Sequence, residues 1–168
     1  LEVVLDRLSV NDIPHVLDSR DFFKRAEIRV PLSWLKVLAN PTLNEDAWRM
    51  LTAAPINLDS AEYAALMRWM SKNKQPHVVA AMRTASRGKQ FSVETLDKIR
   101  GFVEIYDAAA ELLDDLRPGE FVIRLINRIS LKGSLLLRGE GDAPDRLANI
   151  GKLQKLAEDF GARNAQAT

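Results

Sequence analysis

The sequence predicts an all-α fold, an irregular helical bundle with a short helix-strand segment in front of it. Apolar residues recur three and four positions apart along almost the whole chain, which is the spacing of one helix face. Only Ile13 to Leu17 reads as a strand, and one short strand cannot found a sheet. At 168 residues, 46% of them hydrophobic, the chain is long enough for one domain with a core of its own.

The N-terminal segment follows the order of an α/β domain. The apolar residues from Leu1 to Leu8 share one helix face and the strand follows them, but strand-forming sequence never returns. This order is expected where a helical insertion leaves a domain built on a parallel sheet. Because the chain begins within a helical pattern and not at a methionine, we expect a piece of a longer protein. The expected parts are 1–20, the edge of the sheet domain, 21–160, the helical module, and 161–168, a tail or linker.

Four helices are expected in the first half of the module. Pro31 either opens or kinks the first, because proline is tolerated only in the first turn. Asn44 is a candidate cap of the second, and Asp59 with Glu62 has the spacing of a capping box for the third. The segment Pro76 to Ala85 reads as the fourth. The apolar faces of the first three contain Trp34, Leu35 and Leu38, then Trp48 and Leu51, then Tyr63, Leu66, Met67 and Met70.

Three more helices are expected in the second half. The longest should run from a cap at Ser92 to about Leu116, and Pro118-Gly119 ends it. Its apolar seam contains Leu96, Ile99, Val103, Tyr106, Ala110 and Leu113. The next helix carries Val122, Leu125, Ile126 and Ile129 on one stripe. After a loop at 139–142, the last helix turns Ile150, Leu153, Ala157 and Phe160 inward.

Several function classes are excluded by residues that the sequence lacks. There is no Gly-x-x-x-x-Gly-Lys-Ser/Thr loop and no Asp-Glu pair on a strand, so the chain has no ATP site and no catalytic or cofactor residues. His15 and His77 are too isolated to form a metal site or a catalytic base, and Asp114-Asp115 reads as a solvated helix face. No cysteine, no signal peptide and no apolar run of about 20 residues is present, so we expect a soluble, cytoplasmic protein without a membrane partner.

Positive charge is local, because the whole chain carries a formal charge of only +1. The segment from Arg68 to Arg100 has eight Lys or Arg residues and only Glu94 and Asp97 as acids. Four of its cations fall in two loop-like stretches, and they are the candidate phosphate contacts: Lys72, Lys74, Arg87 and Lys89. Flexible cations in loops can bind phosphates without reading bases. The alternative is that they are solvated loops balanced by acids elsewhere.

The segment Phe22 to Pro41 (FFKRAEIRVPLSWLKVLANP) resembles a signature of UvrD/Rep/PcrA-like superfamily 1 DNA helicases. In that family an Ile-Pro-Tyr, a Phe-Phe-x-Arg-x-Glu-Ile and a helix ending in Asn-Pro or Asp-Pro lead from the second RecA-like motor domain into a helical insertion. Ile13-Pro14-His15, Phe22 to Ile28, and Leu38 to Pro41 follow this order here. Arg146 to Phe160 is similar to the final helices of the same insertion.

The resemblance implies that the chain is the inserted 2B subdomain, preceded by the edge of the motor domain. Such a module swivels, contacts duplex or junction DNA without sequence preference, and regulates unwinding. The parent would move 3′ to 5′, and its motor domains would bind ATP and magnesium and be the module's intramolecular partners. The competing interpretation is a free-standing helical module for protein–protein interaction.

The turn after Pro55 is where the chain departs from the family. Relatives carry Gly-Ile-Gly or a related pattern there, and the backbone amides approach duplex phosphates. Ile56 to Ser60 replaces it, with Asn57 as the candidate DNA contact. We expect the side chains of Asn57, Leu58 and Asp59 to hold phosphates away, so that glycine at the first two positions would raise binding.

Overall fold

The computed structural model describes residues 19–113, 115–130 and 142–163. Within these ranges it contains eight helices and no strand, which confirms the predicted all-α class. The helices are α2 (Ser19–Lys24), α3 (Ala26–Ala39), α4 (Asn44–Thr52), α5 (Ser60–Lys72), α6 (Val78–Ser86), α7 (Val93–Glu111), α8 (Pro118–Arg128) and α10 (Ala143–Arg163). The predicted helix-strand segment, His15 and the loop at 139–141 lie outside the described residues.

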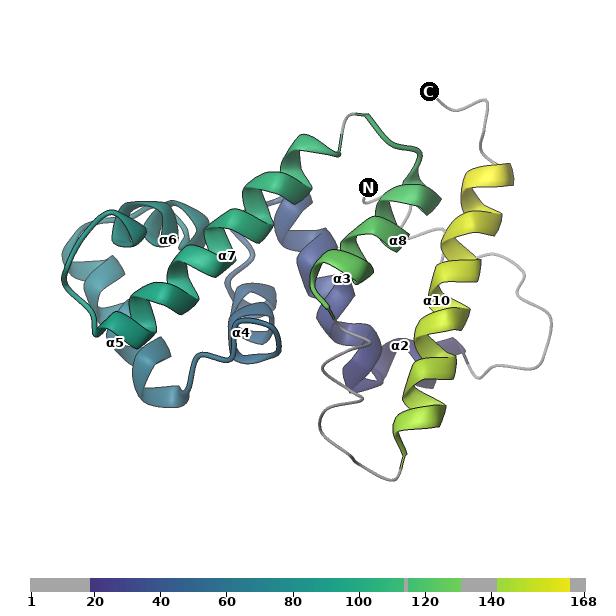
Figure 1. Cartoon of the computed structure of the whole chain (residues 1–168), viewed down its shortest axis with the longest axis horizontal. Coiled ribbons are helices and arrows are strands. Elements are labelled where there is room, and N and C mark those ends of the chain that lie inside the picture. The colour runs from purple at the N-terminus through teal and green to yellow at the C-terminus, as the bar shows by residue number, and fades with distance from the viewer. Residues whose placement is uncertain (1–18, 114, 131–141, 164–168) are drawn as a thin grey trace.

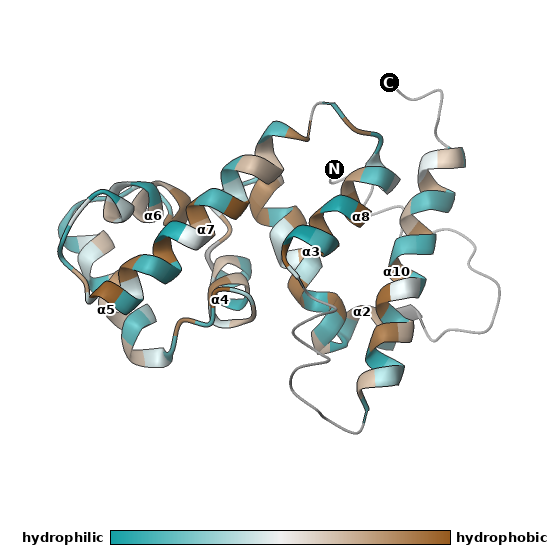
Figure 2. Ribbon diagram, viewed as in Figure 1, coloured by the Kyte–Doolittle hydropathy of each residue, from teal (hydrophilic) through white to brown (hydrophobic). Residues whose placement is uncertain are grey.

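The helices form two groups that α3 and α7 connect. Helices α4, α5 and α6 lie at one end of the long axis, α8 and α10 pack together at the other, and α7 crosses between them (Figure 1). Helix α3 contacts helices of both groups. The helices are amphipathic, with hydrophobic and hydrophilic stripes side by side in Figure 2. One continuous cluster of buried apolar residues therefore joins the two groups.

Three aromatic rings, packed at tilted angles, hold α7 against α3. The centroids of Trp34 and Phe102 are 5.5 Å apart and those of Phe102 and Tyr106 are 5.7 Å apart. Trp34 and Phe102 are fully buried, and the hydroxyl of Tyr106 donates to the carbonyl of Val37 at 3.3 Å. Trp34 and Tyr106 are buried as predicted. Phe102 lies off the predicted seam, because the buried face of α7 passes through 99, 102, 106 and 109 and leaves Val103 and Ala110 partly exposed.

A buried polar contact ties α3 to α10. The amide nitrogen of Asn149 donates to Oε1 of Glu27 at 2.8 Å, and both residues are buried. Glu27 lies in the first turn of α3, where the helix dipole favours a carboxylate. The segment that resembles the helicase signature is thus fixed to a helix more than 100 positions later in the sequence.

Several predicted helix ends differ from the observed ones. Helix α3 begins at Ala26 and continues through Pro31, so the proline does not open it. Asn44 is the first residue of α4, and the capping position belongs to Leu43, so the predicted Asn44 cap is wrong. The capping side chains of Asp59 and Ser92 are confirmed. Helix α7 ends at Glu111 and not near Leu116, and α10, with 21 residues against 19, is the longest described helix.

Pro118 begins a helix here. It occupies the first turn of α8, where its missing N–H is not needed. The predicted stripe of α8, from Val122 to Ile129, is buried. In α10, Ile150, Leu153 and Ala157 are buried, whereas Phe160 is only partly so, and the helix continues three residues past it to Arg163. None of the described helices is long and apolar enough to cross a bilayer.

Candidate nucleic-acid interface

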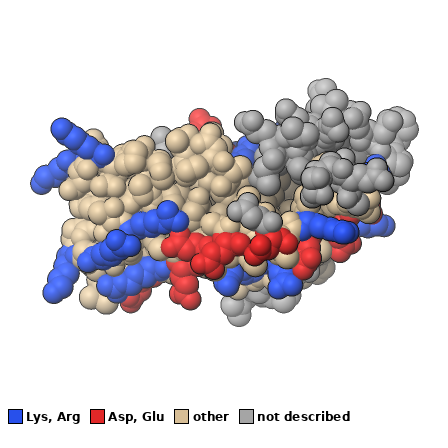
Figure 3. Space-filling view, turned by 90° about the horizontal axis from the view of Figure 1, so that it is seen from above, with Lys and Arg blue, Asp and Glu red and all other residues tan. Residues whose placement is uncertain are grey.

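The predicted cations project from one end of the molecule. Two loops, 73–77 between α5 and α6 and 87–92 between α6 and α7, form this end, and we call them together with Lys72 the basic end. Lys72, Lys74, Arg87 and Lys89 are exposed. Figure 3 shows Lys and Arg side chains gathered there, and a band of Asp and Glu next to them. The structure therefore brings these four predicted residues to one end of the fold.

Contacts between α5, α6 and the second loop hold the basic end together. The rings of Trp69 in α5 and Phe91 in the second loop meet edge to face, with centroids 5.9 Å apart. The hydroxyl of Thr84 donates to Oε1 of Gln75 in the first loop at 3.3 Å. Gln90 donates its amide to the carbonyl of Ala85 at 3.1 Å. The cations thus extend from anchored loops, which lowers the entropy that a ligand must remove.

The first loop begins with a complete Schellman motif. The amide of Gln75 donates to the carbonyl of Met70 at 3.0 Å, and the amide of Lys74 donates to that of Ser71 at 3.2 Å. Lys74 occupies the left-handed position with a φ of 49°, where glycine is the usual residue. His77 then caps α6, because its Nδ1 accepts from the amide of Ala80 at 3.3 Å. This histidine has a structural role, as its isolation in the sequence indicated.

Ion pairs divide the cations of the segment Arg68 to Arg100 into two sets. Three of them are paired within the described part of the chain: Lys98 with Glu62, Arg83 with Asp107, and Arg100 with Asp97. The four predicted contacts and Arg68 have no ion pair among the described residues. Two of the neutralising acids, Glu62 and Asp107, lie outside this stretch of sequence, so counting charges within it overestimates the free cations.

The turn that carries Asn57 has a left-handed backbone at Asn57, and one of the three side chains predicted to obstruct a ligand, that of Leu58, is buried. Asn57 has a φ of 54° and is exposed. Its backbone N–H donates to the carbonyl of Ala53 at 3.0 Å. The side chain of Leu58 is in the core, 3% exposed, so it does not project towards a ligand. The expectation that Leu58 holds phosphates away is therefore wrong. Glycine in place of Leu58 would open a cavity in the core. Of the three residues 56–58, only Asn57 exposes its side chain to solvent.

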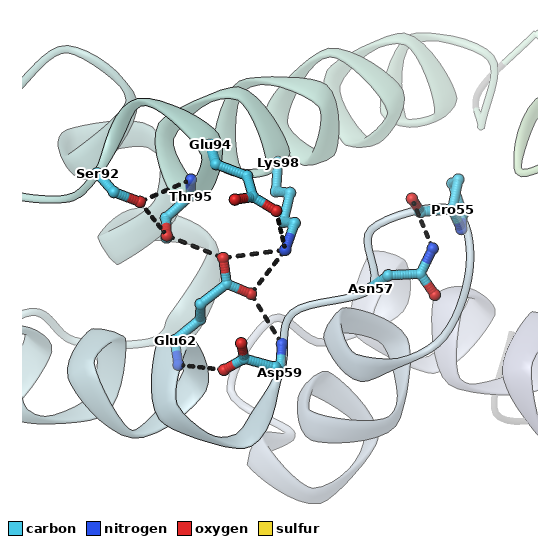
Figure 4. A network of polar contacts seen from close by, with 8 residues as sticks. All are labelled: Pro55, Asn57, Asp59, Glu62, Ser92, Glu94, Thr95 and Lys98. Carbon is cyan, nitrogen blue, oxygen red and sulfur yellow. Dashed lines mark hydrogen bonds and ion pairs between the residues drawn. The ribbon is translucent and has the colours of Figure 1, made fainter.

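Asp59 and Glu62 form the predicted capping box, and Glu62 also connects α5 to α7. Oδ1 of Asp59 accepts from the amide of Glu62, and Oε2 of Glu62 accepts from the amide of Asp59, both at 2.8 Å. Lys98 donates to both carboxylate oxygens of Glu62 at 3.0 and 2.8 Å, and Thr95 donates to one of them at 2.9 Å (Figure 4). Glu62 and Lys98 are 36 positions apart, so no local sequence pattern indicates their contact.

The pKa of Glu62 reflects this network. Burial by itself raises the pKa, but the hydrogen bonds from Lys98, from the backbone of Asp59 and from Thr95 together outweigh it, and the pKa is lowered from its ordinary value of 4.5. Because the folded value is lower than the unfolded one, the stabilisation is present above about pH 4.5 and is lost as the pH falls through the folded pKa.

We expect Glu62→Gln to lower the free energy of unfolding by about 1 kcal/mol at pH 7, because the amide keeps the shape but not the charge. The difference from the wild type should be smaller at pH 3 than at pH 7, because protonation of the wild-type carboxylate sets in as the pH falls below the ordinary value of 4.5 towards the lowered folded pKa. Urea unfolding at both pH values measures this. Glu104→Gln is the control, because Glu104 is an exposed carboxylate on α7 that has no ion pair among the described residues. A loss that is equal at both pH values would contradict the charge-based explanation.

The Asn57 turn and the basic end lie at opposite ends of α5. This helix has 13 residues, which at about 1.5 Å per residue separates its two ends by about 20 Å. The structure therefore brings four of the five predicted site residues together and places Asn57 apart from them. No cluster of three or more metal-ligating side chains is found in the ranges that the structure describes.

No family model matches the chain. Among curated proteins, it is 30% identical over 171 residues to the ATP-dependent DNA helicase UvrD1 of Mycobacterium bovis and to the same-named proteins of two strains of Mycobacterium tuberculosis. The match covers 99% of this chain but only 21% of each relative. The chain is thus similar, along nearly its whole length, to about a fifth of a UvrD-like helicase.

Proposed function

We propose that the chain is the 2B subdomain of a UvrD-like superfamily 1 DNA helicase and that its basic end binds duplex or junction DNA without reading sequence. The similarity to about a fifth of UvrD1 supports the helicase part of this proposal. The all-α fold is compatible with an inserted helical module. The parts expected from the sequence, 1–20 as the edge of the motor domain, 21–160 as the module and 161–168 as a linker, remain a proposal, and α2 (Ser19–Lys24) and α10 (Ala143–Arg163) cross their boundaries.

The observation that carries the DNA contact is the set of unpaired cations at the end of α5 and on the two anchored loops. Lys72, Lys74, Arg87 and Lys89 are exposed and have no ion pair among the described residues. Phosphates release counterions when such cations neutralise them, which drives binding irrespective of base sequence. The second loop is also fixed to α5 through Trp69 and Phe91. A rigid basic end of this kind fits a regulatory module that grips and releases the duplex ahead of a motor.

The parent protein would supply the catalysis. Its motor domains would bind ATP and magnesium, hydrolyse the nucleotide in the cytoplasm and move 3′ to 5′ along a single strand. The chain itself would change its position relative to those domains and so enable or limit unwinding. The hinges that we propose for this motion are segment 17–20, which runs into the start of α2, and the residues after Phe160, which begin in the last turn of α10.

Replacing Lys72, Lys74, Arg87 and Lys89 together with Ala is expected to weaken binding to a fluorescent 20-base-pair duplex at least tenfold at low salt. The slope of log affinity against log salt should fall by about 4, since about one counterion is released per phosphate contact. Two duplexes of unrelated sequence should lose affinity equally. Fluorescence anisotropy across a salt series measures all three quantities.

A charge-matched control variant replaces four other exposed cations of the described chain with Ala: Arg29, Arg128, Lys152 and Lys155. It has the same net charge as the first variant and should keep most of the affinity. If both variants lose affinity equally, only the overall charge matters and the basic end is not the site.

Lys74→Gly separates folding from binding. Glycine suits the left-handed position, so this change should stabilise the fold by about 0.5–1 kcal/mol while removing one DNA contact.

A further inference from the structure

A groove between α4 and α5 lies away from the basic end. Glu45, Trp48, Arg49 and Tyr63 line it, and its volume is about 420 Å³. Its walls come from the two helices on either side of the Asn57 turn, so it lies near the opposite end of α5 from the four cations. The proposed DNA contact does not use these surfaces.

One wall of the groove is aromatic and exposed. The side chain of Trp48 is 42% exposed, which makes it one of the three exposed large hydrophobic residues of the described chain. Its ring meets that of Tyr63 edge to face, with centroids 4.6 Å apart and planes at 80°. This contact holds the indole in place without covering it. Rigid exposed aromatic rings of this kind are enriched in the centres of protein–protein interfaces.

The charged wall contains a guanidinium that is already hydrogen-bonded within the fold and a carboxylate that has no ion pair among the described residues. Arg49 donates to Oδ1 of Asp46 and to the hydroxyl of Ser33, both at 3.1 Å, so its guanidinium is engaged within the fold. Glu45 is exposed and has no ion pair among the described residues, although Arg49 lies only one helical turn away. The groove therefore combines an indole face with unneutralised negative charge.

We propose that this groove binds an arginine side chain presented by a protein partner. A guanidinium is planar, stacks on an indole and pairs with a carboxylate, so Trp48 and Glu45 can engage it together. An unpaired nucleobase would also stack on Trp48, but its phosphates would approach the unpaired carboxylate of Glu45. Charge complementarity thus favours a cationic peptide over a nucleic acid. The inference is independent of the DNA contact, because it uses other residues.

The test is an NMR titration of the 168-residue chain with the capped peptide acetyl-Gly-Arg-Gly-amide. The indole N–H signal of Trp48 is assigned by its loss in Trp48→Phe, and the signals of Trp34 and Trp69 report whether the fold is intact. We expect a saturable shift of the Trp48 signal. Replacing arginine in the peptide with citrulline, which keeps the shape and removes the charge, should weaken binding at least fivefold.

Glu45→Gln should weaken binding of the arginine peptide at least fivefold. Glu104→Gln should leave it unchanged, because Glu104 is an exposed carboxylate on α7, outside the groove. The variant with four Ala residues at the basic end should bind the peptide like the wild type, which separates this proposal from the DNA contact. Equal binding of the citrulline peptide, or no effect of Glu45→Gln, would overturn the proposal. So would a Trp48 shift with oligothymidine and none with the peptide, or no shift with either.

Discussion

Phe102→Ala should lower the free energy of unfolding by about 3–5 kcal/mol, a large part of the roughly 5–15 kcal/mol that stabilises a typical domain. Phe102 is fully buried, and its ring packs between those of Trp34 and Tyr106. Truncation removes both ring contacts and leaves a cavity where α7 crosses α3. Because α3 contacts helices of both groups, the cavity lies at the junction on which the whole core depends.

Urea unfolding followed by circular dichroism measures this loss. Val93→Ala is the matched control on the same helix, because the side chain of Val93 is 75% exposed and its truncation should change stability by less than about 0.5 kcal/mol. Phe102→Leu should fall between the two, since it keeps most of the apolar volume. A loss below about 1.5 kcal/mol for Phe102→Ala would mean that the ring stack does not join the two groups of helices.

Phe102 also shows what sequence periodicity can and cannot predict about a helix. Alternating steps of three and four residues from Leu96 predict a step of four after Ile99, to Val103, whereas the buried face of α7 takes a step of three, to Phe102, and continues at Tyr106 and Ala109. The existence of this helix and its Ser92 cap were predictable from local residues. Which of Phe102 and Val103 turns inward depends on the position of Trp34, which is distant in sequence.

For the candidate site, too, some features are predictable from the sequence and others depend on tertiary contacts. Lys72, Lys74, Arg87 and Lys89 could be selected from sequence because their loops lack apolar periodicity. That they remain unpaired while Lys98 is held by Glu62 follows from tertiary contacts, as does the burial of Leu58. The sequence predicts Trp48 only as part of an apolar helix face, since nothing in it shows that Tyr63 holds the ring at the surface.

Gly119→Ala should destabilise the chain by about 1–3 kcal/mol, although alanine is the better helix former. Gly119 lies in the first turn of α8, where that helix crosses α10. A Cβ at this position would lie 2.6 Å from the carbonyl oxygen of Ala157 and 2.9 Å from the Cα of Glu158. Both are backbone atoms of α10, which cannot rotate away as a side chain would, so the two helices must separate and their shared apolar contacts weaken.

Gly101 and Gly151 supply controls in which the sign of the effect should reverse. Both lie inside helices, and a Cβ at either position would meet nothing within 4 Å. Gly101→Ala and Gly151→Ala should therefore stabilise the chain by about 0.5–1 kcal/mol, because alanine restricts the unfolded chain and favours the helix. Thermal unfolding of the three variants side by side gives the comparison. Stabilisation by Gly119→Ala as well would show that α8 and α10 do not approach closely enough to require glycine, and that their packing rests on the apolar stripe of α8 alone.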